Sequence, residues 1–255
     1  MQRFSVSLIG TYETCPYKCL RQYNVVGEEK IEDDLNFYGE FGALIHELFD
    51  MYYKSDKHIS FEEMLEIFHK KVTEMECEFP DGKKDKYLSG AYDQIEYFYD
   101  KYAIMKPIRT EEEIDFYIEG IDLPFKGFID RVDGSIEEQD IVLSDYKTGR
   151  SSKFTKKELS DNVQATVYAL YYKQKYGFYP SRFVFIFTNE RKTKEIEINE
   201  AFVQRGLARL RRSIEAINNN IFIAEPKGGK YFCKEFCKYY VECPKYIKSN
   251  DGWDL

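Results

Sequence analysis

The chain has 255 residues, of which 43% are hydrophobic and 17% aromatic, so it can bury a sizeable core and is expected to form a single domain over 1–255. The sequence contains no apolar run of signal-peptide length and none of the roughly 20 apolar residues that a membrane span needs, so we expect a cytoplasmic protein without membrane contact. The net charge of −8 excludes a protein that coats nucleic acid indiscriminately, and any such contact must use a local basic groove.

The first part of the chain has the pattern of helices. Residues 36–54 carry apolar side chains at helical spacing, namely Phe37, Phe41, Leu44, Ile45, Leu48 and Tyr52. This spacing predicts an amphipathic helix with Asn36 as its N-cap. Residues 61–106 are helical in pattern too, interrupted by the loop "FPDGKKDK". We therefore expect a mostly helical first part, with a helical subregion at about 55–106.

The period of the pattern then changes to two. Three short strands are predicted in "EEIDFYIEG", "LPFKGFIDRVDG" and "IVLSDYKTG", with turn residues between them, as in an antiparallel meander. A helix at about 161–176, the apolar strand "RFVFIFT" and a helix near 200–218 follow. This order predicts an α/β fold with a mixed central sheet flanked by helices.

The third strand ends in a charged pair. Asp145 and Lys147 point to the same face because side chains alternate along a strand, while Tyr146 points to the other. Such a pair is often only a weak ion pair at a strand end. Asp130, near the end of the second strand, lies beside Asp145 if the two strands pair. Two neighbouring carboxylates repel each other unless a cation lies between them, and a hard divalent ion is the usual solution.

Two helices add further polar groups. On the first helix, His46 lies almost opposite the apolar stripe, on a face shared with Gly39 and Gly42. A lone histidine is more often an ordinary residue than a ligand, but two glycines inside a helix are disfavoured by roughly 1 kcal/mol each. We therefore expect something to approach this face closely. Gln164 and Tyr168 share one face of the helix that follows the third strand.

Four motifs together resemble a known family. "GALIH", "GFIDRVD", "DYKTG" and "QATVY", with the opening "SLIGTYETCPYKC", are similar to the RecB-like branch of the PD-(D/E)XK nuclease superfamily across nearly the whole chain. That branch includes the AddB nuclease domain and the CRISPR-associated RecB-like exonucleases. The resemblance implies a restriction-endonuclease-like fold with an inserted helical region. It also implies a DNA nuclease, specifically an exonuclease that acts on single-stranded DNA or on DNA ends. Such an enzyme would take part in DNA repair or recombination.

The resemblance also implies residue roles. His46, Asp130 and Asp145 would be metal ligands for one or two Mg²⁺ or Mn²⁺ ions. The carbonyl of Tyr146 would complete the metal site. Lys147 would be the catalytic lysine, and Gln164 and Tyr168 would brace the site or the DNA strand. Phosphodiester hydrolysis needs a nucleophilic water and stabilisation of a charged phosphate, and divalent ions with a lysine can supply both.

Four cysteines form a second constellation. Cys233, Cys237 and Cys243 lie in the segment 231–245, and Cys15 lies far earlier in a similar "CP" context. Four thiolates can hold a [4Fe–4S] cluster or a tetrahedral zinc ion. The resemblance favours the iron–sulfur cluster, which would join the two ends of the domain. The family usually has two residues between the first two carboxy-terminal cysteines, whereas "CKEFC" has three, so Cys19 is an alternative ligand.

Basic residues follow the third strand and the later apolar strand: Arg150, Lys153, Lys156, Lys157, Arg191, Lys192 and Lys194. They could track a phosphate backbone, although solvated lysine runs are commoner than binding grooves. Two alternatives to a nuclease stay open. One is a non-catalytic iron–sulfur DNA-binding scaffold subunit of a helicase or integrase complex. The other is a zinc-stapled nuclease-like protein that binds RNA.

Overall fold

The structure is a computed structural model, and it describes residues 2–25, 37–227 and 229–247. The chain folds into two compact units. Unit 1 comprises Met1–Asp34, Asp115–Lys126 and Leu207–Leu255, and unit 2 comprises Leu35–Ile114 and Gly127–Gly206. The single domain over 1–255 stays a prediction, and the predicted N-cap Asn36 lies outside the described residues.

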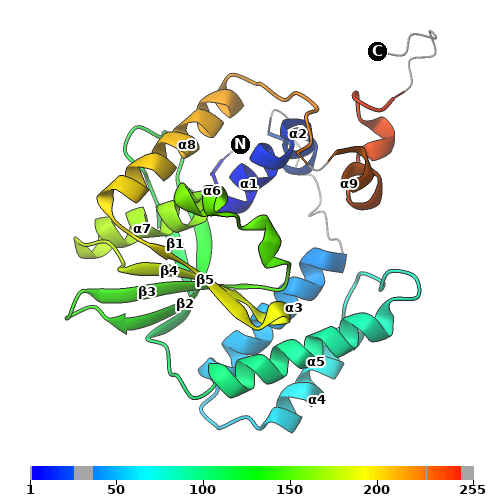
Figure 1. Cartoon of the computed structure of the whole chain (residues 1–255), viewed down its shortest axis with the longest axis vertical. Coiled ribbons are helices and arrows are strands. Elements are labelled where there is room, and N and C mark those ends of the chain that lie inside the picture. The colour runs from blue at the N-terminus through cyan, green and yellow to red at the C-terminus, as the bar shows by residue number, and fades with distance from the viewer. Residues whose placement is uncertain (1, 26–36, 228, 248–255) are drawn as a thin grey trace. The chain divides into compact units, whose positions relative to one another are not determined.

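Three helices begin unit 2: α3 (Phe37–Lys54), α4 (Phe61–Thr73) and α5 (Lys84–Lys101) (Figure 1). Ser60 starts α4 with a capping box, in which its side chain accepts from the Glu63 amide and the Glu63 carboxylate accepts from the Ser60 amide. Aromatic rings fill the core between the helices, and Phe49 stacks on Phe98 with ring centroids 4.0 Å apart. The helices predicted at 36–54 and 61–106, with their interrupting loop, are confirmed.

A five-stranded sheet completes unit 2. Its strands, in spatial order, are β1 (Arg109–Phe116), β2 (Phe125–Ser135), β3 (Asp140–Lys147), β4 (Arg182–Phe187) and β5 (Lys192–Glu197). β2 and β3 are antiparallel, β3 and β4 parallel, and β4 and β5 antiparallel, so the sheet is mixed as predicted. A parallel pair needs a crossover connection. Here it contains η1 (Ser151–Lys153), α6 (Lys156–Ser160) and α7 (Val163–Tyr176).

Different helices cover the two faces of the sheet. Because side chains alternate along a strand, Tyr146 and Ile186 lie on one face and Asp145 and Phe183 on the other. Tyr146 and Ile186 belong to the core formed with α3, α4 and α5. On the opposite face, Tyr168 of α7 packs against Phe183, with ring centroids 6.0 Å apart. The end of β3 is therefore buried between two layers of helices.

Unit 1 contains α1 (Val6–Thr14), α2 (Pro16–Tyr23), the later part of α8 (Glu200–Asn218), α9 (Gly229–Phe236) and η3 (Tyr240–Glu242). The Tyr12 hydroxyl donates to the Ile221 carbonyl at 2.7 Å, and Glu13 forms an ion pair with Arg209. These contacts tie α1 to α8 and to the segment that follows it. Among the described residues, we find no helix with the length and apolar character needed to cross a membrane.

Candidate metal centre and cysteine pocket

His46 projects from α3 towards β2. Its Nδ1 lies 3.1 Å from Asp130 Oδ2. Burial of the imidazole opposes protonation, but the Asp130 carboxylate outweighs this effect, and the pKa of His46 is raised. One helical turn earlier, a Cβ at Gly42 would lie 3.4 Å from the Thr148 Oγ1. The close approach expected at this face of the helix is thus made by the segment that follows β3.

Asp130 directly precedes the part of β2 that pairs with β3, because this pairing begins at Arg131. The Asp130 carboxylate accepts a hydrogen bond from the Tyr146 amide, with 2.7 Å between Oδ2 and N, so it is held beside the end of β3. Arg131 is only 1% exposed, and its guanidinium donates to the Asp133 carboxylate and to the Tyr53 hydroxyl of α3. These contacts fix the backbone from which Asp130 projects.

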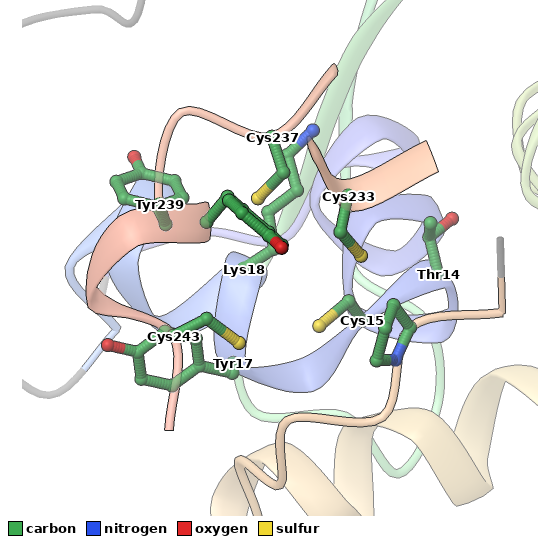
Figure 2. A pocket seen from close by; sticks show the side chains of 10 residues that line it. Thr14, Cys15, Tyr17, Lys18, Cys233, Cys237, Tyr239 and Cys243 are labelled. Carbon is green, nitrogen blue, oxygen red and sulfur yellow. The ribbon is translucent and has the colours of Figure 1, made fainter. Parts of the chain in front are cut away.

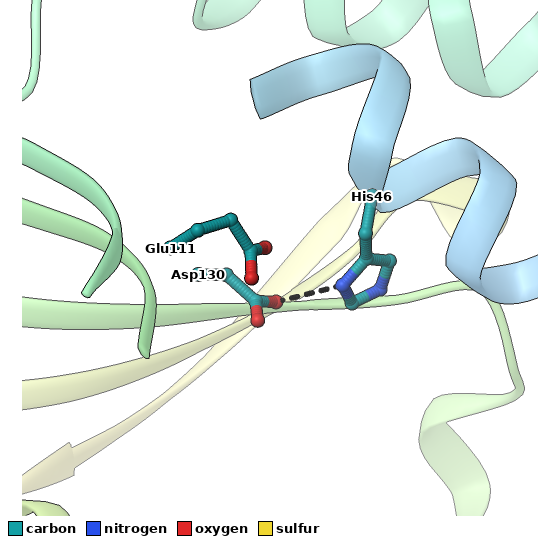
Figure 3. Close-up of side chains that lie close together, drawn as sticks. All are labelled: His46, Glu111 and Asp130. Atoms are coloured by element: carbon teal, nitrogen blue, oxygen red, sulfur yellow. Dashed lines mark ion pairs between the residues drawn. The ribbon is translucent and has the colours of Figure 1, made fainter. Parts of the chain in front are cut away.

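Glu111, on β1, completes this group, and the sequence analysis missed it (Figure 3). His46, Glu111 and Asp130 each offer a ligand atom, and these atoms lie within 4.8 Å of one another. Glu111 has a φ of +45°, a left-handed conformation that is strained for a residue with a Cβ and is enriched at functional sites. Burial, and then the charge of Asp130, raises the pKa of Glu111 to about 7.

The charged end of β3 forms a separate polar set. Lys147 Nζ lies 2.7 Å from Asp145 Oδ2 and 3.2 Å from Gln164 Oε1, and Gln164 Nε2 donates to Asp145 Oδ1. Asp145 is 4% exposed. Burial raises the pKa of Asp145, against the opposing effect of the Lys147 ammonium. The predicted same-face pair is therefore present, and α7 holds it through Gln164.

The predicted ligands fall into two neighbouring groups. His46 and Asp130 meet with Glu111, whereas the Asp145 carboxylate faces Lys147 and Gln164. Burial is the largest cause of the raised pKa of Asp145, and the charge of Asp130 raises it further. The two carboxylates are therefore still close to each other.

Two of the remaining predicted residues brace the backbone between these groups. The Tyr168 hydroxyl donates to the Phe128 carbonyl at 2.6 Å, two residues before Asp130 on β2. Tyr146 gives its amide to Asp130, and its ring packs in the core of unit 2. The metal-binding and catalytic roles of the whole set stay predictions.

The predicted basic residues differ in their availability. Those after β4 are engaged within unit 2: Arg191 and Lys192 pair with carboxylates, and Lys194 donates to two main-chain carbonyls. By contrast, the side chains of Arg150, Lys156 and Lys157, which follow β3, are exposed, and Lys153 is exposed too but has an interaction of its own. The segment after β3 is therefore the better candidate for contact with a phosphate backbone.

Four cysteines line one pocket in unit 1: Cys15, Cys233, Cys237 and Cys243. Cys15 is the N-cap residue of α2, Cys233 lies on α9, and Cys243 follows η3. Figure 2 shows the four sulfur atoms directed into the space between these segments. Burial raises the pKa of the Cys233 and Cys237 thiols, so binding of a metal group would have to displace their protons.

Cys19 is placed differently. It is fully buried, is absent from the lining of the pocket, and its Sγ donates to the Leu8 carbonyl at 3.7 Å. Burial, and then the charge of Cys15, raises the pKa of Cys19 to about 12. Cys19 thus serves the packing of α1 and α2, and this position does not support the alternative in which it replaces a ligand.

Comparison with known proteins gives one family match. The model of the PD-(D/E)XK nuclease superfamily matches residues 3–244. No curated protein matches the sequence. A crystal structure from Eubacterium rectale, described as a candidate exonuclease, is 15% identical with a TM-score of 0.52, covering 91% of this chain and 87% of that chain. That likeness shows the fold alone. The crystal structure of SSO0001 is also 15% identical, and the match covers 91% of this chain and 96% of that chain. Its TM-score of 0.39 is too low to support an inference about the fold.

Proposed function

The chain belongs to the PD-(D/E)XK nuclease superfamily, and from this we propose that it is a Mg²⁺- or Mn²⁺-dependent deoxyribonuclease of the RecB-like branch. Nucleases of this superfamily generally use divalent metals. One observation carries the proposal: the group of His46, Glu111 and Asp130 lies beside the buried Asp145 and its ion-pair partner Lys147.

The donor set of this group fits a divalent ion. Carboxylates suit Mg²⁺ and Mn²⁺, and an imidazole is compatible with Mn²⁺. Burial and then the Asp130 charge raise the pKa of Glu111 to about 7, and the Asp130 carboxylate raises the pKa of His46 against the opposing effect of burial. A divalent ion between these groups would offset the charge of Asp130, so the ligands present fit the metal that the family uses.

The other residues have supporting roles in this proposal. A bound divalent ion supplies a nucleophilic water and neutralises charge on the phosphate. Lys147, oriented by Asp145 and Gln164, presents an ammonium that offsets the negative charge developing on the phosphate. Tyr168 holds the Phe128 carbonyl and so fixes the part of β2 that carries the metal ligand.

The test is cleavage of end-labelled DNA in the presence of Mn²⁺. Asp145→Asn should abolish cleavage, and Lys147→Ala should reduce it by about 10²–10³-fold while DNA and Mn²⁺ binding persist, because its role is confined to the transition state. Lys192→Ala removes a lysine that pairs with Glu190, and serves as the control with unchanged cleavage. Normal turnover by Asp145→Asn would refute the site.

We further propose that the enzyme is an exonuclease on single strands or DNA ends. The description of the Eubacterium rectale protein and the exposed Arg150, Lys156 and Lys157 after β3 support this proposal. An exonuclease should degrade linear single-stranded DNA and leave a circular single strand of the same sequence intact. Equal cleavage of both would make the enzyme an endonuclease.

For the cysteine pocket we propose a [4Fe–4S] cluster held by Cys15, Cys233, Cys237 and Cys243. The four thiols come from three separate segments and line one pocket, and Figure 2 shows their sulfur atoms directed into it, as a set of cluster ligands requires. Anaerobically purified protein should be brown and contain about four iron atoms per chain. One zinc ion in a colourless protein would refute the iron.

If the nuclease proposal failed, the remaining candidate would be a non-catalytic scaffold subunit of a helicase or integrase complex. In that case the protein would contain iron and bind DNA, yet it would cleave neither linear nor circular DNA with Mn²⁺. The complete acid, acid and lysine set of Asp130, Asp145 and Lys147 favours the enzyme.

A further inference from the structure

Asp50 carries a buried oxygen without a hydrogen-bond partner. Its Oδ2 lies 2.8 Å from Lys54 Nζ, in an ion pair one turn along α3. Its Oδ1 is buried, and among the described residues nothing donates to it. A buried acceptor without a donor destabilises a folded protein, and such an atom calls for an explanation, such as a bound water or ion.

The position of Asp50 connects this oxygen with the metal centre. Residues four apart on a helix lie on the same face, so Asp50 is the neighbour of His46 one turn further along α3. The charge of Asp50 also acts on Glu111, where it contributes to the raised pKa after burial, Asp130 and the opposing His46. The Asp50 side chain is 14% exposed, so solvent does not screen it strongly.

We propose that Asp50 is an outer positioning residue of this metal centre, whose Oδ1 accepts a hydrogen bond from the hydration shell of the divalent ion held by His46, Glu111 and Asp130. The inference rests on the proposed function, because it takes the ion as given. Mg²⁺ dehydrates reluctantly and keeps several waters when few protein ligands bind it. Removal of a residue that orients the ligands of a metal ion from outside typically lowers the metal affinity 10–100-fold.

The ion pair with Lys54 does not account for the geometry of Asp50. That pair uses Oδ2 and leaves Oδ1 without a donor. An (i, i+4) ion pair on a helix stabilises by less than one buried acceptor without a partner costs. If the pair were the whole role of Asp50, the residue would therefore be a net loss to the fold.

The experiment measures Mn²⁺ binding to the full chain without DNA, by the loss of the electron paramagnetic resonance signal of free Mn²⁺. Asp50→Ala should weaken Mn²⁺ binding by about 10–100-fold. Lys54→Met removes the partner in the ion pair and keeps Asp50, so it should leave Mn²⁺ affinity within about twofold of wild type. The metal-free melting temperature of Asp50→Ala should be equal to or above that of wild type, because the variant loses an unpaired acceptor.

The outcomes separate this inference from the proposed function. Equal Mn²⁺ affinity of wild type and Asp50→Ala overturns the role of Asp50 and leaves the metal centre in place. Equal weakening by Asp50→Ala and Lys54→Met overturns it too, since the helix ion pair would then be what matters. A wild-type protein that binds no Mn²⁺ overturns the metal centre, and the inference with it.

Discussion

Glu111 combines two features that are unfavourable without a metal ion. Its backbone has a positive φ, and its half-buried carboxylate lies next to Asp130. His46 and Asp130 have ordinary positions on a helix and a strand, so the strain is concentrated in one residue. Such a residue is expected to be worth more to the bound state than to the stability of the free protein.

The raised pKa of the Glu111 carboxyl group should make the free energy of unfolding depend on pH. Its pKa is raised from about 4.5 to about 7 in the folded chain, so the charged form is disfavoured by folding. The contribution of this group is therefore fully present below about pH 4.5 and is lost as the pH rises through 7. In metal-free protein at pH 8, Glu111→Gln should be more stable than wild type by about 1–2 kcal/mol, after allowance for solvent screening.

Thermal melts with EDTA between pH 5 and pH 8 measure this effect. The melting temperatures of wild type and Glu111→Gln should diverge as the pH rises. Addition of Mn²⁺ at pH 8 should raise the melting temperature of wild type more than that of the variant, because the ion is bound by the carboxylate that the variant lacks. Parallel pH profiles in EDTA would contradict the assignment.

The same residues show how far sequence reasoning reaches. Asp145 and Lys147 were predictable as a same-face pair, because strand alternation needs no knowledge of the rest of the fold. Glu111 was not, since it stands in the run "EEE" and its left-handed backbone breaks the alternation that would have oriented it. Local pattern cannot identify a residue whose conformation depends on neighbours distant in the sequence.

At the scale of elements, α7 links the site to the rest of unit 2. It holds the end of β3 through Gln164 and the middle of β2 through Tyr168. The helix was predictable from its apolar pattern, whereas β5 was missed. Ile196 is the one buried residue of "KTKEIE", so that edge strand lacks the alternation by which a strand is recognised.

The packing of α7 against the first part of α8 depends on a glycine. A Cβ at Gly206 would lie 1.8 Å from Thr166 Oγ1 and 2.8 Å from Thr166 Cβ. Thr166 is fully buried, and its hydroxyl donates to the Asn162 carbonyl, so it has little room to move. Gly206→Ala should therefore destabilise the protein by about 1–3 kcal/mol.

The matched control is Gly10→Ala in α1, where no atom lies within 4 Å of the added Cβ. That change should stabilise by about 0.5–1 kcal/mol, because alanine is the better helix former. For a chain of this size each kcal/mol corresponds to about 2–4 °C in melting temperature. Stabilisation by both variants in thermal melts would show that α7 and α8 do not pack as closely as described.

At the scale of the whole molecule, each unit is assembled from separate stretches of the chain. The boundaries fall at 34–35, 114–115, 126–127 and 206–207, so the chain passes between the units four times. The helical first part and the mixed sheet were predictable from periodicity. The division into units was not, because it depends on which distant segments meet, as α2 and α9 do at the cysteine pocket.

The cysteine pocket should stabilise unit 1 when it is loaded. Cys243→Ala should bleach the brown colour and lower the melting temperature, because terminal segments stay ordered only when they are tied down. Cys19→Ala and Cys77→Ala should both leave the visible absorbance unchanged, since neither residue lines the pocket. Loss of colour in Cys19→Ala would show that the three-residue gap in "CKEFC" has rearranged the ligands.

The order of the segments along the chain has a consequence for biosynthesis. Every residue of the proposed cleavage site lies between His46 and Tyr168, and unit 2 ends at Gly206, whereas the pocket of unit 1 needs Cys243. Because translation proceeds from the N-terminus and early parts can fold first, the ribosome delivers all the side chains of the proposed cleavage site before the last cysteine is made. Cluster insertion would then be a late maturation step, and a nascent chain stalled between Gly206 and Cys243 would carry the cutting residues without the means to anchor its own N-terminal helices.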